Sequence, residues 1–343
     1  MPTIEAPLRV GVIGLGQWGP NHVRIFSRMT GCAVTRICDR SERSLAAARR
    51  QFPGIDASLD PGSITDADDI DAVVVATPVK YHHPLVKRAL QNGKHVLCEK
   101  PLSGTARSSY ELAALAARRR LTLMVGHIFL YNSGTLHLRD AITRGDLGRI
   151  YYMDAVRTNL GPVRTDVSVA FDLASHDISI FNFLLGARPA AVSAVGAAYL
   201  QRRVEDISFL TLWYPRGVVC HVHTSWLNPR KVRQLTVVGD RKMAVWDDMN
   251  TLEPVRTYDK GVVTNGYASF GEFHMKLRDG AITIPKIRPF EPLVRQNEEF
   301  AASIRSGRPP SASARFGADI VQILEAARRS MRSGGRTVSI RFK

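Results

Sequence analysis

The first 127 residues alternate short apolar runs with amphipathic stretches of helical period. The apolar runs predict strands, at residues 8–14, 33–39, 71–77, 94–100 and 121–127. The stretches between them predict helices, over residues 20–29, 41–51, 84–92 and 105–120. Crossovers of this length force parallel pairing of the strands they join. This part of the chain therefore predicts an α/β domain, a doubly wound parallel sheet with helices on both faces.

After residue 127 the pattern changes to that of an open, largely antiparallel sheet with helices, an α+β arrangement. Strands are expected at residues 149–157, 191–199, 207–214, 217–226, 233–238, 243–247 and 337–342. Helices are expected at residues 135–144, 171–185, 291–306 and 316–333. Residues 259–290 are rich in glycine and polar residues, which predicts a loop. We expect two domains, over residues 1–126 and 127–343.

The bulk composition is that of an ordinary globular protein, apart from its charge. The 343 residues are 45% hydrophobic and 23% charged, with a formal net charge of +16. Such a charge suits nucleic-acid binding, but the lysines and arginines spread along the whole chain. The chain also has no spacing typical of a helix-turn-helix or a zinc finger, so we expect no nucleic-acid partner.

The cysteines and the N-terminus predict where the protein works. Cys32, Cys38, Cys98 and Cys220 form no C-x-x-C pair and lie mostly in apolar runs, so we expect reduced thiols and no metal site. The first residues lack the basic start and apolar core of a signal peptide, and no later stretch predicts a membrane span. We expect a cytoplasmic protein with no membrane partner.

A glycine-rich turn joins the first predicted strand to the first predicted helix. Gly14, Gly16 and Gly19 fit G-x-G-x-x-G, with Gln17 and Trp18 between the last two glycines. The first glycine permits the tight turn, the second lets the backbone approach a pyrophosphate, and the third lets helix and strand pack closely. Together these residues predict a dinucleotide site with the phosphates at the helix N-terminus.

The end of the second predicted strand bears on which dinucleotide binds. Asp39 lies twenty residues after Gly19, where a carboxylate can reach the adenosine ribose hydroxyls. Its negative charge would repel the 2′-phosphate of NADP, which favours NAD. Arg40 and Ser41 follow directly and could receive that phosphate, so NADP stays open as the alternative.

Polar or turn residues follow three further predicted strands. These are Thr77-Pro78, Glu99-Lys100-Pro101 and Gly126-His127. Ligands of open parallel sheets sit beyond the carboxyl ends of the strands. We therefore expect these residues to share one site with the glycine turn.

Four motifs together resemble the Gfo/Idh/MocA family, the glucose-fructose oxidoreductase and inositol dehydrogenase group, over nearly the whole chain. They are the glycine fingerprint, Ala76-Thr77-Pro78 with His82 after it, Glu99-Lys100-Pro101, and Asp172-Leu173-Ala174-Ser175-His176-Asp177. The resemblance implies an N-terminal Rossmann domain that binds a nicotinamide dinucleotide. It also implies a C-terminal open sheet that forms one wall of the substrate site and often an oligomer interface, so a homodimer or homotetramer is expected.

The resemblance also assigns roles to individual residues. Lys100, in a cis bond to Pro101, would hydrogen-bond the reacting hydroxyl and the nicotinamide ribose, His176 would be the acid/base, and Asp172 its partner at the substrate. An imidazole with an ordinary pKa of about 6.5 suits proton transfer near neutral pH. Residues four apart share one face of an α-helix. Further cofactor-binding residues implied are Gln17, Trp18, Arg40, Thr77, Pro78, His82 and Glu99.

Residues 126–132, 157–161 and 172–179 resemble the members that act on nucleotide sugars in amino-sugar and antibiotic-sugar pathways. Arg157 and Arg164 would supply guanidinium groups for a diphosphate. Sugar hydroxyls would meet His127, Tyr131, Asn132 and Asn159. The expected reaction is hydride transfer between NAD(P) and a secondary alcohol or ketone, at C3 of a nucleotide sugar. A cyclitol or free-sugar dehydrogenase, and a regulator that binds NAD(H) without turnover, stay open as alternatives.

Overall fold

The computed structural model describes residues 6–165, 167–202, 204–263 and 276–343. The chain divides into two compact units. The first contains residues 1–131, 291–322 and 342–343, and the second contains residues 132–290 and 323–341. Residues 291–322 thus belong to the first unit, whereas the expected C-terminal domain includes them. The sequence of an amphipathic helix does not show which sheet the helix will cover.

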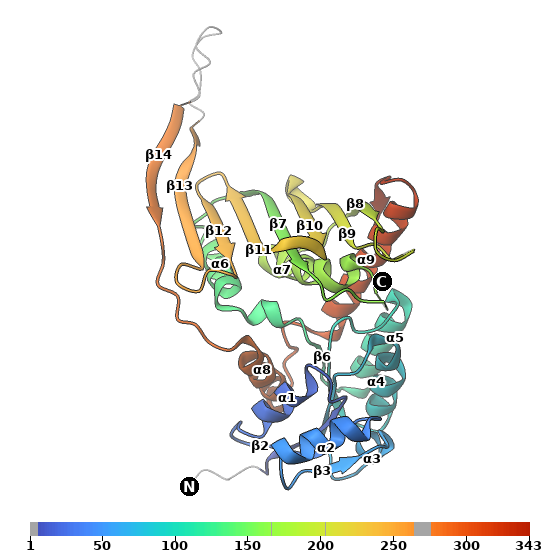
Figure 1. Ribbon diagram of the computed structural model, residues 1–343. Coiled ribbons are helices and arrows are strands. Elements are labelled where there is room, and N and C mark those ends of the chain that lie inside the picture. Colours follow the sequence, from blue (N-terminus) through green and yellow to red (C-terminus); the bar gives the residue numbers. More distant parts are fainter. Residues whose placement is uncertain (1–5, 166, 203, 264–275) are drawn as a thin grey trace. The chain divides into compact units, whose positions relative to one another are not determined.

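The first unit is built on a six-stranded parallel sheet in the order β3-β2-β1-β4-β5-β6, of which β2, β3 and β6 are labelled in Figure 1. Its strands are β1 (Leu8–Ile13), β2 (Cys32–Cys38), β3 (Asp56–Ser58), β4 (Ala72–Val75), β5 (His95–Cys98) and β6 (Leu123–Val125). Every neighbouring pair is parallel. Residues 72–75 are entirely buried, as expected of a strand covered on both faces. The expected doubly wound sheet is thus confirmed, with the three-residue β3 added.

Helices cover both faces of this sheet. They are α1 (Gly19–Phe26), α2 (Glu42–Gln51), α3 (Gly62–Thr65), α4 (His82–Gln91), α5 (Ala106–Arg119) and α8 (Pro292–Ser306), with short 3₁₀ turns η1 (Val79–Tyr81) and η2 (Ile128–Tyr131). Helices α1 and α8 pack together, with Phe26 edge-on to Phe300. The strand order reverses between β1 and β4, so right-handed crossovers put α1 and α4 on opposite faces. The carboxyl ends of β1 and β4 flank the crevice where ligands of such sheets bind.

The second unit is built on a nine-stranded sheet in the order β14-β13-β12-β11-β7-β10-β9-β8-β15. Its strands are β7 (Ile150–Leu160), β8 (Ala191–Ala197), β9 (Ile207–Trp213), β10 (Val219–Ser225), β11 (Leu227–Gly239), β12 (Met243–Asp247), β13 (Val255–Val263), β14 (Lys276–Thr283) and β15 (Val338–Ser339). The β7–β10 pair is parallel and the other pairs are antiparallel. The expected largely antiparallel sheet is confirmed.

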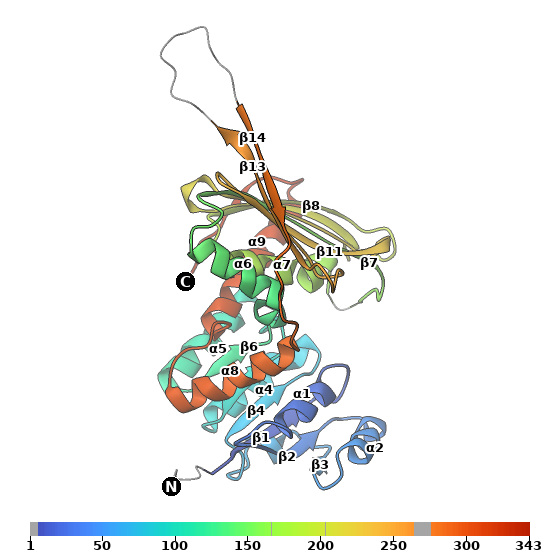
Figure 2. The same cartoon turned by 90° about the vertical axis from the view of Figure 1, so that its left-hand side faces the viewer.

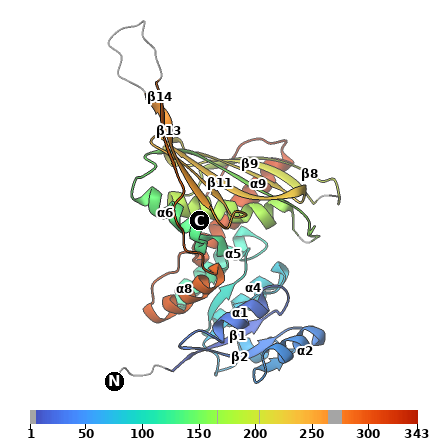
Figure 3. The same ribbon diagram turned by 60° about the vertical axis from the view of Figure 1, so that its left-hand side comes forward.

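The loop expected over residues 259–290 is wrong for much of its length. Strands β13 and β14 pair there and extend the sheet at one edge (Figure 3), and residues 264–275 between them lie outside the described residues. The charged residues of β13 and β14 made this stretch resemble a loop. Charged residues are also typical of strands at a sheet edge, where they hinder pairing with another chain.

One face of the second unit's sheet carries helices (Figure 2). These are α6 (Ser133–Thr143), the π-helix η3 (Ala170–Ala174), α7 (Ser175–Leu185) and α9 (Ala314–Arg332), of which α9 is divided between the units; a short turn η4 (Pro215–Gly217) joins β9 to β10. Leu210, Leu212 and Val222 are buried on the covered face. On the opposite face Tyr152, Val195 and Phe209 are exposed. In the part of the chain that the structure describes, no helix is long and apolar enough to cross a bilayer.

Candidate active site

The glycine turn has the geometry that a dinucleotide requires. Gly14 has a φ of +95°, and a Cβ there would lie 2.6 Å from the Ala76 carbonyl oxygen. A Cβ on Gly19 would lie 1.8 Å from the Gly14 carbonyl oxygen, whereas a Cβ on Gly16 would meet no atom within 4 Å. Gly16 therefore leaves open space beside the backbone, and no described side chain caps the N-terminus of α1. This N-terminus suits a phosphate, since its N–H groups lack intrahelical partners.

Asp39 is tied to the glycine turn by its carboxylate. One oxygen accepts the Leu15 N–H at 2.7 Å and the other accepts the Ser41 N–H at 2.8 Å. Arg40 donates to the Tyr81 hydroxyl at 2.9 Å. The Lys80 ammonium lies 5.0 Å from the centre of the Tyr81 ring. Arg40, directly after this carboxylate, thus shares Tyr81 with Lys80. The carboxylate suits the ribose hydroxyls of NAD, and the two cations keep the NADP alternative open.

His82 and Thr77 lie at the carboxyl end of β4. The His82 ring is buried, with its Nε2 2.7 Å from the Thr77 carbonyl oxygen and its Nδ1 2.9 Å from the Pro101 carbonyl oxygen. Thr77 Oγ1 is buried and has no hydrogen-bond partner among the described residues. An orphaned hydroxyl beside the glycine turn fits a site that a polar cofactor completes.

Lys100 follows β5, and both of its neighbours are held in place. The Lys100–Pro101 bond is cis, as expected. The Glu99 carboxylate binds Nε2 of the buried His22 at 3.0 Å and accepts the Lys100 N–H at 3.3 Å. A Cβ on Gly126 would lie 2.9 Å from a Glu99 carboxylate oxygen, so glycine leaves room for this carboxylate. The backbone at Lys100 is thus held by the Glu99 carboxylate, which binds His22 of α1 and fits against Gly126 after β6.

His127 is buried beside Lys100 as a neutral imidazole. Its side chain is 1% exposed and packs edge-on against the Phe316 ring, with centroids 5.7 Å apart. Burial, and then the positive charge of Lys100, lower the pKa of His127 to about 3. Both ring nitrogens lack a hydrogen-bond partner among the described residues. A bound ligand or water would satisfy them, which fits a place in the site.

Two side chains expected at sugar hydroxyls have other partners. The Tyr131 hydroxyl donates to Glu299 on α8, and burial, followed by the charge of Glu299, raises its pKa well above the usual range. Asn132 caps α6 through the Gly134 N–H at 2.8 Å and donates to Asp248 at 2.9 Å. Each of these side chains is thus hydrogen-bonded to residues of its own unit.

Arg157, expected at a diphosphate, is bound to an acidic side chain of the protein. Its guanidinium is buried on β7 and binds the Asp177 carboxylate of α7 with two short bonds, of 2.8 and 2.9 Å. A diphosphate would have to displace this buried carboxylate to reach the guanidinium. Asn159 donates to the Gly161 carbonyl oxygen within the same segment.

Asp172 and His176 lie on the two sides of a change in helix type. Asp172 belongs to the π-helix η3 and His176 to the first turn of α7. Because a π-turn is wider than an α-turn, the angle between the Asp172 and His176 side chains around the helix axis differs from the one that α-helical spacing predicts. π-Turns occur frequently at functional sites. Arg164 lies 3.5 Å from the Asp172 carboxylate, with 40% of its side chain exposed. In the second unit, the structure thus brings Arg164 to Asp172.

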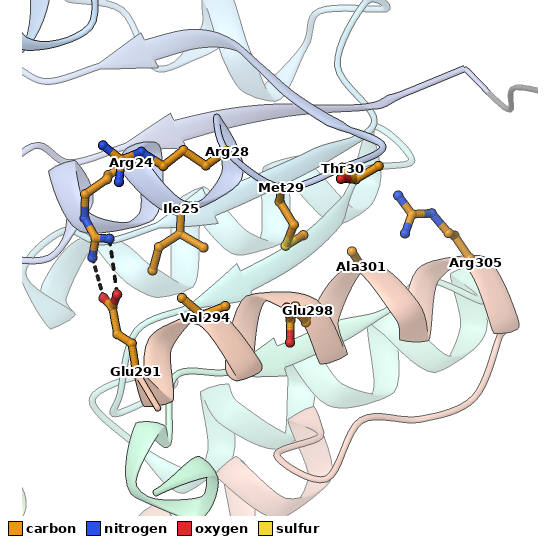
Figure 4. Close-up of a pocket in the computed structure, with 10 residues that line it drawn as sticks. All are labelled: Arg24, Ile25, Arg28, Met29, Thr30, Glu291, Val294, Glu298, Ala301 and Arg305. Atoms are coloured by element: carbon orange, nitrogen blue, oxygen red, sulfur yellow. Dashed lines mark hydrogen bonds and ion pairs between the residues drawn. The ribbon is translucent and has the colours of Figure 1, made fainter. Parts of the chain in front are cut away.

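Two features of the first unit have no signal in the sequence pattern. His22 follows the glycine fingerprint inside α1. Its buried ring has a hydrogen-bond partner, Glu99, that lies 77 residues further along the chain. A pocket of about 560 Å³ lies between α1 and α8 (Figure 4), and none of the predicted site residues lines it. Arg24 and Glu291 pair at its end. Among the described residues, no group of histidine, cysteine and acidic side chains could hold a metal ion.

Comparison with known proteins places these features in a family. A model described as the oxidoreductase family with an NAD-binding Rossmann fold (GFO_IDH_MocA) matches residues 8–127, and a GFO/IDH/MocA C-terminal domain model matches residues 135–245. The crystal structure of GenD2 from gentamicin A biosynthesis, in complex with NAD, has a TM-score of 0.83 at 22% identity, covering 99% of this chain and 98% of that one. This likeness supports the fold.

Two curated relatives differ in how much of the chain they match. Inositol 2-dehydrogenase 4 of Saccharopolyspora erythraea is 35% identical over 191 residues, 54% of this chain and 56% of that protein. UDP-N-acetylglucosamine 3-dehydrogenase of Acidithiobacillus ferrooxidans is 28% identical over 308 residues, 88% of this chain and 90% of that protein. The alignment thus spans about half the length of the first relative and most of the second. Because the two family models together match more than half of its residues, the chain belongs to the GFO/IDH/MocA family of oxidoreductases, with an NAD-binding Rossmann domain.

Proposed function

We propose that this oxidoreductase catalyses NAD-dependent oxidation of a secondary alcohol at C3 of a nucleotide sugar, or the reverse reduction of the ketone. The extent of the alignments carries the proposal. The match to the UDP-N-acetylglucosamine 3-dehydrogenase covers 88% of this chain, whereas the match to the inositol dehydrogenase covers 54%. The longer match includes much of the second unit, which holds Asp172 and His176 and in which substrate selection is expected.

The proposed chemistry needs a base for the hydroxyl proton while hydride leaves the carbinol carbon. We assign proton removal to His176, with Asp172 stabilising the imidazolium that forms. Lys100 hydrogen-bonds the same hydroxyl oxygen and stabilises the negative charge that develops there. The dinucleotide, held by the glycine turn and Asp39, supplies the hydride acceptor when bound.

The substrate contacts are assigned by what each side chain already binds. Arg164 is the arginine that we assign to a diphosphate, because its guanidinium is partly exposed and lies beside Asp172. We assign His127 to a hydroxyl of substrate or ribose, because its neutral ring keeps one donor and one acceptor. Arg157 is assigned instead to holding α7 on the sheet.

A thermal-shift panel tests the substrate class. The protein is heated with NAD, NADP, UDP, dTDP, UDP-N-acetylglucosamine, myo-inositol or glucose, and stabilising ligands are then assayed for NADH formation at 340 nm. A ligand that binds only the folded protein raises its melting temperature. We expect UDP or dTDP alone to stabilise it and a nucleotide sugar to be turned over. Turnover of inositol or glucose, with no effect of either nucleotide, would assign the protein to the cyclitol or free-sugar class.

We also infer that the protein forms a homodimer or homotetramer through the uncovered face of the nine-stranded sheet. Val195, Phe209 and Tyr152 lie on that face and are exposed, although the opposite residues of the same strands are buried. Exposed apolar side chains gathered on one face are typical of an interaction surface.

A further inference from the structure

His82 joins two loops of the first unit that carry proposed active-site groups. It is the first residue of α4, and its side chain is 1% exposed. One ring nitrogen lies 2.7 Å from the carbonyl oxygen of Thr77, at the end of β4. The other lies 2.9 Å from the carbonyl oxygen of Pro101, the residue directly after Lys100. The imidazole therefore bridges the ends of two neighbouring parallel strands.

The chemistry of the two contacts indicates the charge of the ring. A carbonyl oxygen can only accept a hydrogen bond, and a neutral imidazole has a single N–H to donate. In a neutral ring, the lone pair of the second nitrogen would face carbonyl lone pairs at less than 3 Å. Both contacts are favourable only when both nitrogens carry a proton. An imidazolium would also make the stronger, charge-assisted type of hydrogen bond.

The acidic side chains on the adjoining segments are bound to other cations. Glu99, at the end of β5, binds His22. Glu111, on α5, binds Lys87 and His83 of α4. The other charged groups of η1, α4 and α5, together with Lys100, are all lysines and arginines. The negative ends of two backbone carbonyl groups therefore face the His82 ring directly.

We propose that His82 is a doubly protonated positioning residue that fixes the backbone at Lys100. The inference rests on the proposed function, in which Lys100 contacts the reacting hydroxyl. Residue 101 is held through its carbonyl group by His82, and residue 99 through its carboxylate by His22. Lys100 is thus anchored through both of its neighbours, and misplacing a reactive group by about 1 Å can cost about 10²-fold in rate.

The charge of the ring is tested without an activity assay. Full-length protein with nitrogen-15 in its histidine rings is studied by long-range proton–nitrogen NMR at about pH 7.5, above the ordinary histidine pKa of about 6.5. The His82 signals are identified by their loss in His82→Gln. We expect both ring nitrogens of His82 to have the shift of a protonated nitrogen. A spectrum with one bare nitrogen would overturn the proposal.

The positioning role is tested with a pair of neighbouring variants. We expect His82→Gln, whose single amide nitrogen cannot reach both carbonyl groups, to lower kcat by about 10²-fold and to change the Kd for NAD by a smaller factor. The matched control His83→Gln changes the neighbouring histidine, whose side chain is 31% exposed, and should keep wild-type kcat. An unchanged kcat in a folded His82→Gln would refute the role. If that variant does not fold, the His82 ring signals of the wild type are identified instead by their through-space contacts with Thr77 and Pro101, and they still decide the charge. If no sugar is turned over, the proposed function fails, whereas the spectrum still tests the charge of His82.

Discussion

At the scale of the single residue, Lys100 separates an enzyme from a protein that only binds the dinucleotide. Its ammonium group is assigned to the reacting oxygen, whereas the glycine turn and Asp39 are assigned to the cofactor. We expect Lys100→Met to lower turnover by at least about 10²-fold and to leave the Kd for NAD within about 3-fold, as measured at 340 nm and by calorimetry. Lys87→Met, which removes a surface cation, is the control. Undiminished turnover would argue for another catalytic group.

The buried His127 predicts how stability depends on pH. Burial and Lys100 lower its pKa to about 3 in the folded protein, against about 6.5 in the unfolded chain. Between these values the unfolded chain binds more protons, so this contribution to stability is present above about pH 6.5 and is lost as the pH falls. From about pH 7.5 to 5.5, the wild type should lose about 1.4 kcal/mol more unfolding free energy than His127→Phe. Urea unfolding of both proteins measures the difference, and equal losses would contradict a buried neutral ring.

Residue identities alone could indicate part of the site. Glu99-Lys100-Pro101 and the glycine fingerprint are local motifs, and the structure gives them the expected cis bond and tight turn. The partners of Tyr131 and Asn132 could not be foreseen, because Glu299 and Asp248 lie 168 and 116 residues further along the chain. A polar side chain at a strand end shows that a partner is needed, and only the fold shows whether that partner is a ligand or the protein itself.

At the scale of the element, the Arg157–Asp177 pair joins β7 to α7, the helix that carries His176. Both side chains are almost fully buried. Removing one partner leaves the other charge buried without compensation, which costs about 3–5 kcal/mol. We expect Arg157→Met to lose that much stability, as measured by urea unfolding followed through the buried Trp226 and Trp246.

The matched control for this pair is Arg164→Met. Arg164 also lies next to an acidic residue, Asp172 of η3, but its side chain is partly exposed. Its replacement should therefore lower the free energy of unfolding by less than about 1 kcal/mol. The double variant Arg157→Met/Asp177→Leu removes both charges and should recover part of the loss. Equal effects of Arg157→Met and Arg164→Met would show that the buried pair contributes no more than a surface contact.

Elements differed in how well their sequences predicted them. Strands β1, β4 and β5 are buried on both faces, so continuous apolar runs marked them clearly. Strands β13 and β14 lie toward one edge of their sheet and carry charged residues, so their sequences predicted a loop. The π-helix η3 differs from an α-helix in its hydrogen bonds rather than in its composition, and no periodicity over five residues could distinguish the two.

At the scale of the whole molecule, the uncovered face of the nine-stranded sheet should hold copies of the chain together. Val195 and Phe209 are paired across β8 and β9, and they are 50% and 38% exposed. The Phe209 ring stacks on the His223 ring of β10, with ring centroids 4.5 Å apart, so a surface of stacked rings continues from β9 to β10. We expect light scattering after size exclusion to give a dimer or tetramer mass for the wild type.

A charge placed on that face should dissociate the assembly, because burying an unpaired carboxylate between copies is costly. We expect Phe209→Asp to give a monomer mass at micromolar concentration with its melting temperature close to that of the wild type. Leu252→Asp is the matched control, since Leu252 is an isolated apolar residue of the same unit with 91% exposure. If Phe209→Asp keeps the wild-type mass, the oligomer uses another surface, and a monomeric wild type would exclude assembly through any face. Loss of mass in both variants would instead indicate that added negative charge, rather than the sheet face, controls association.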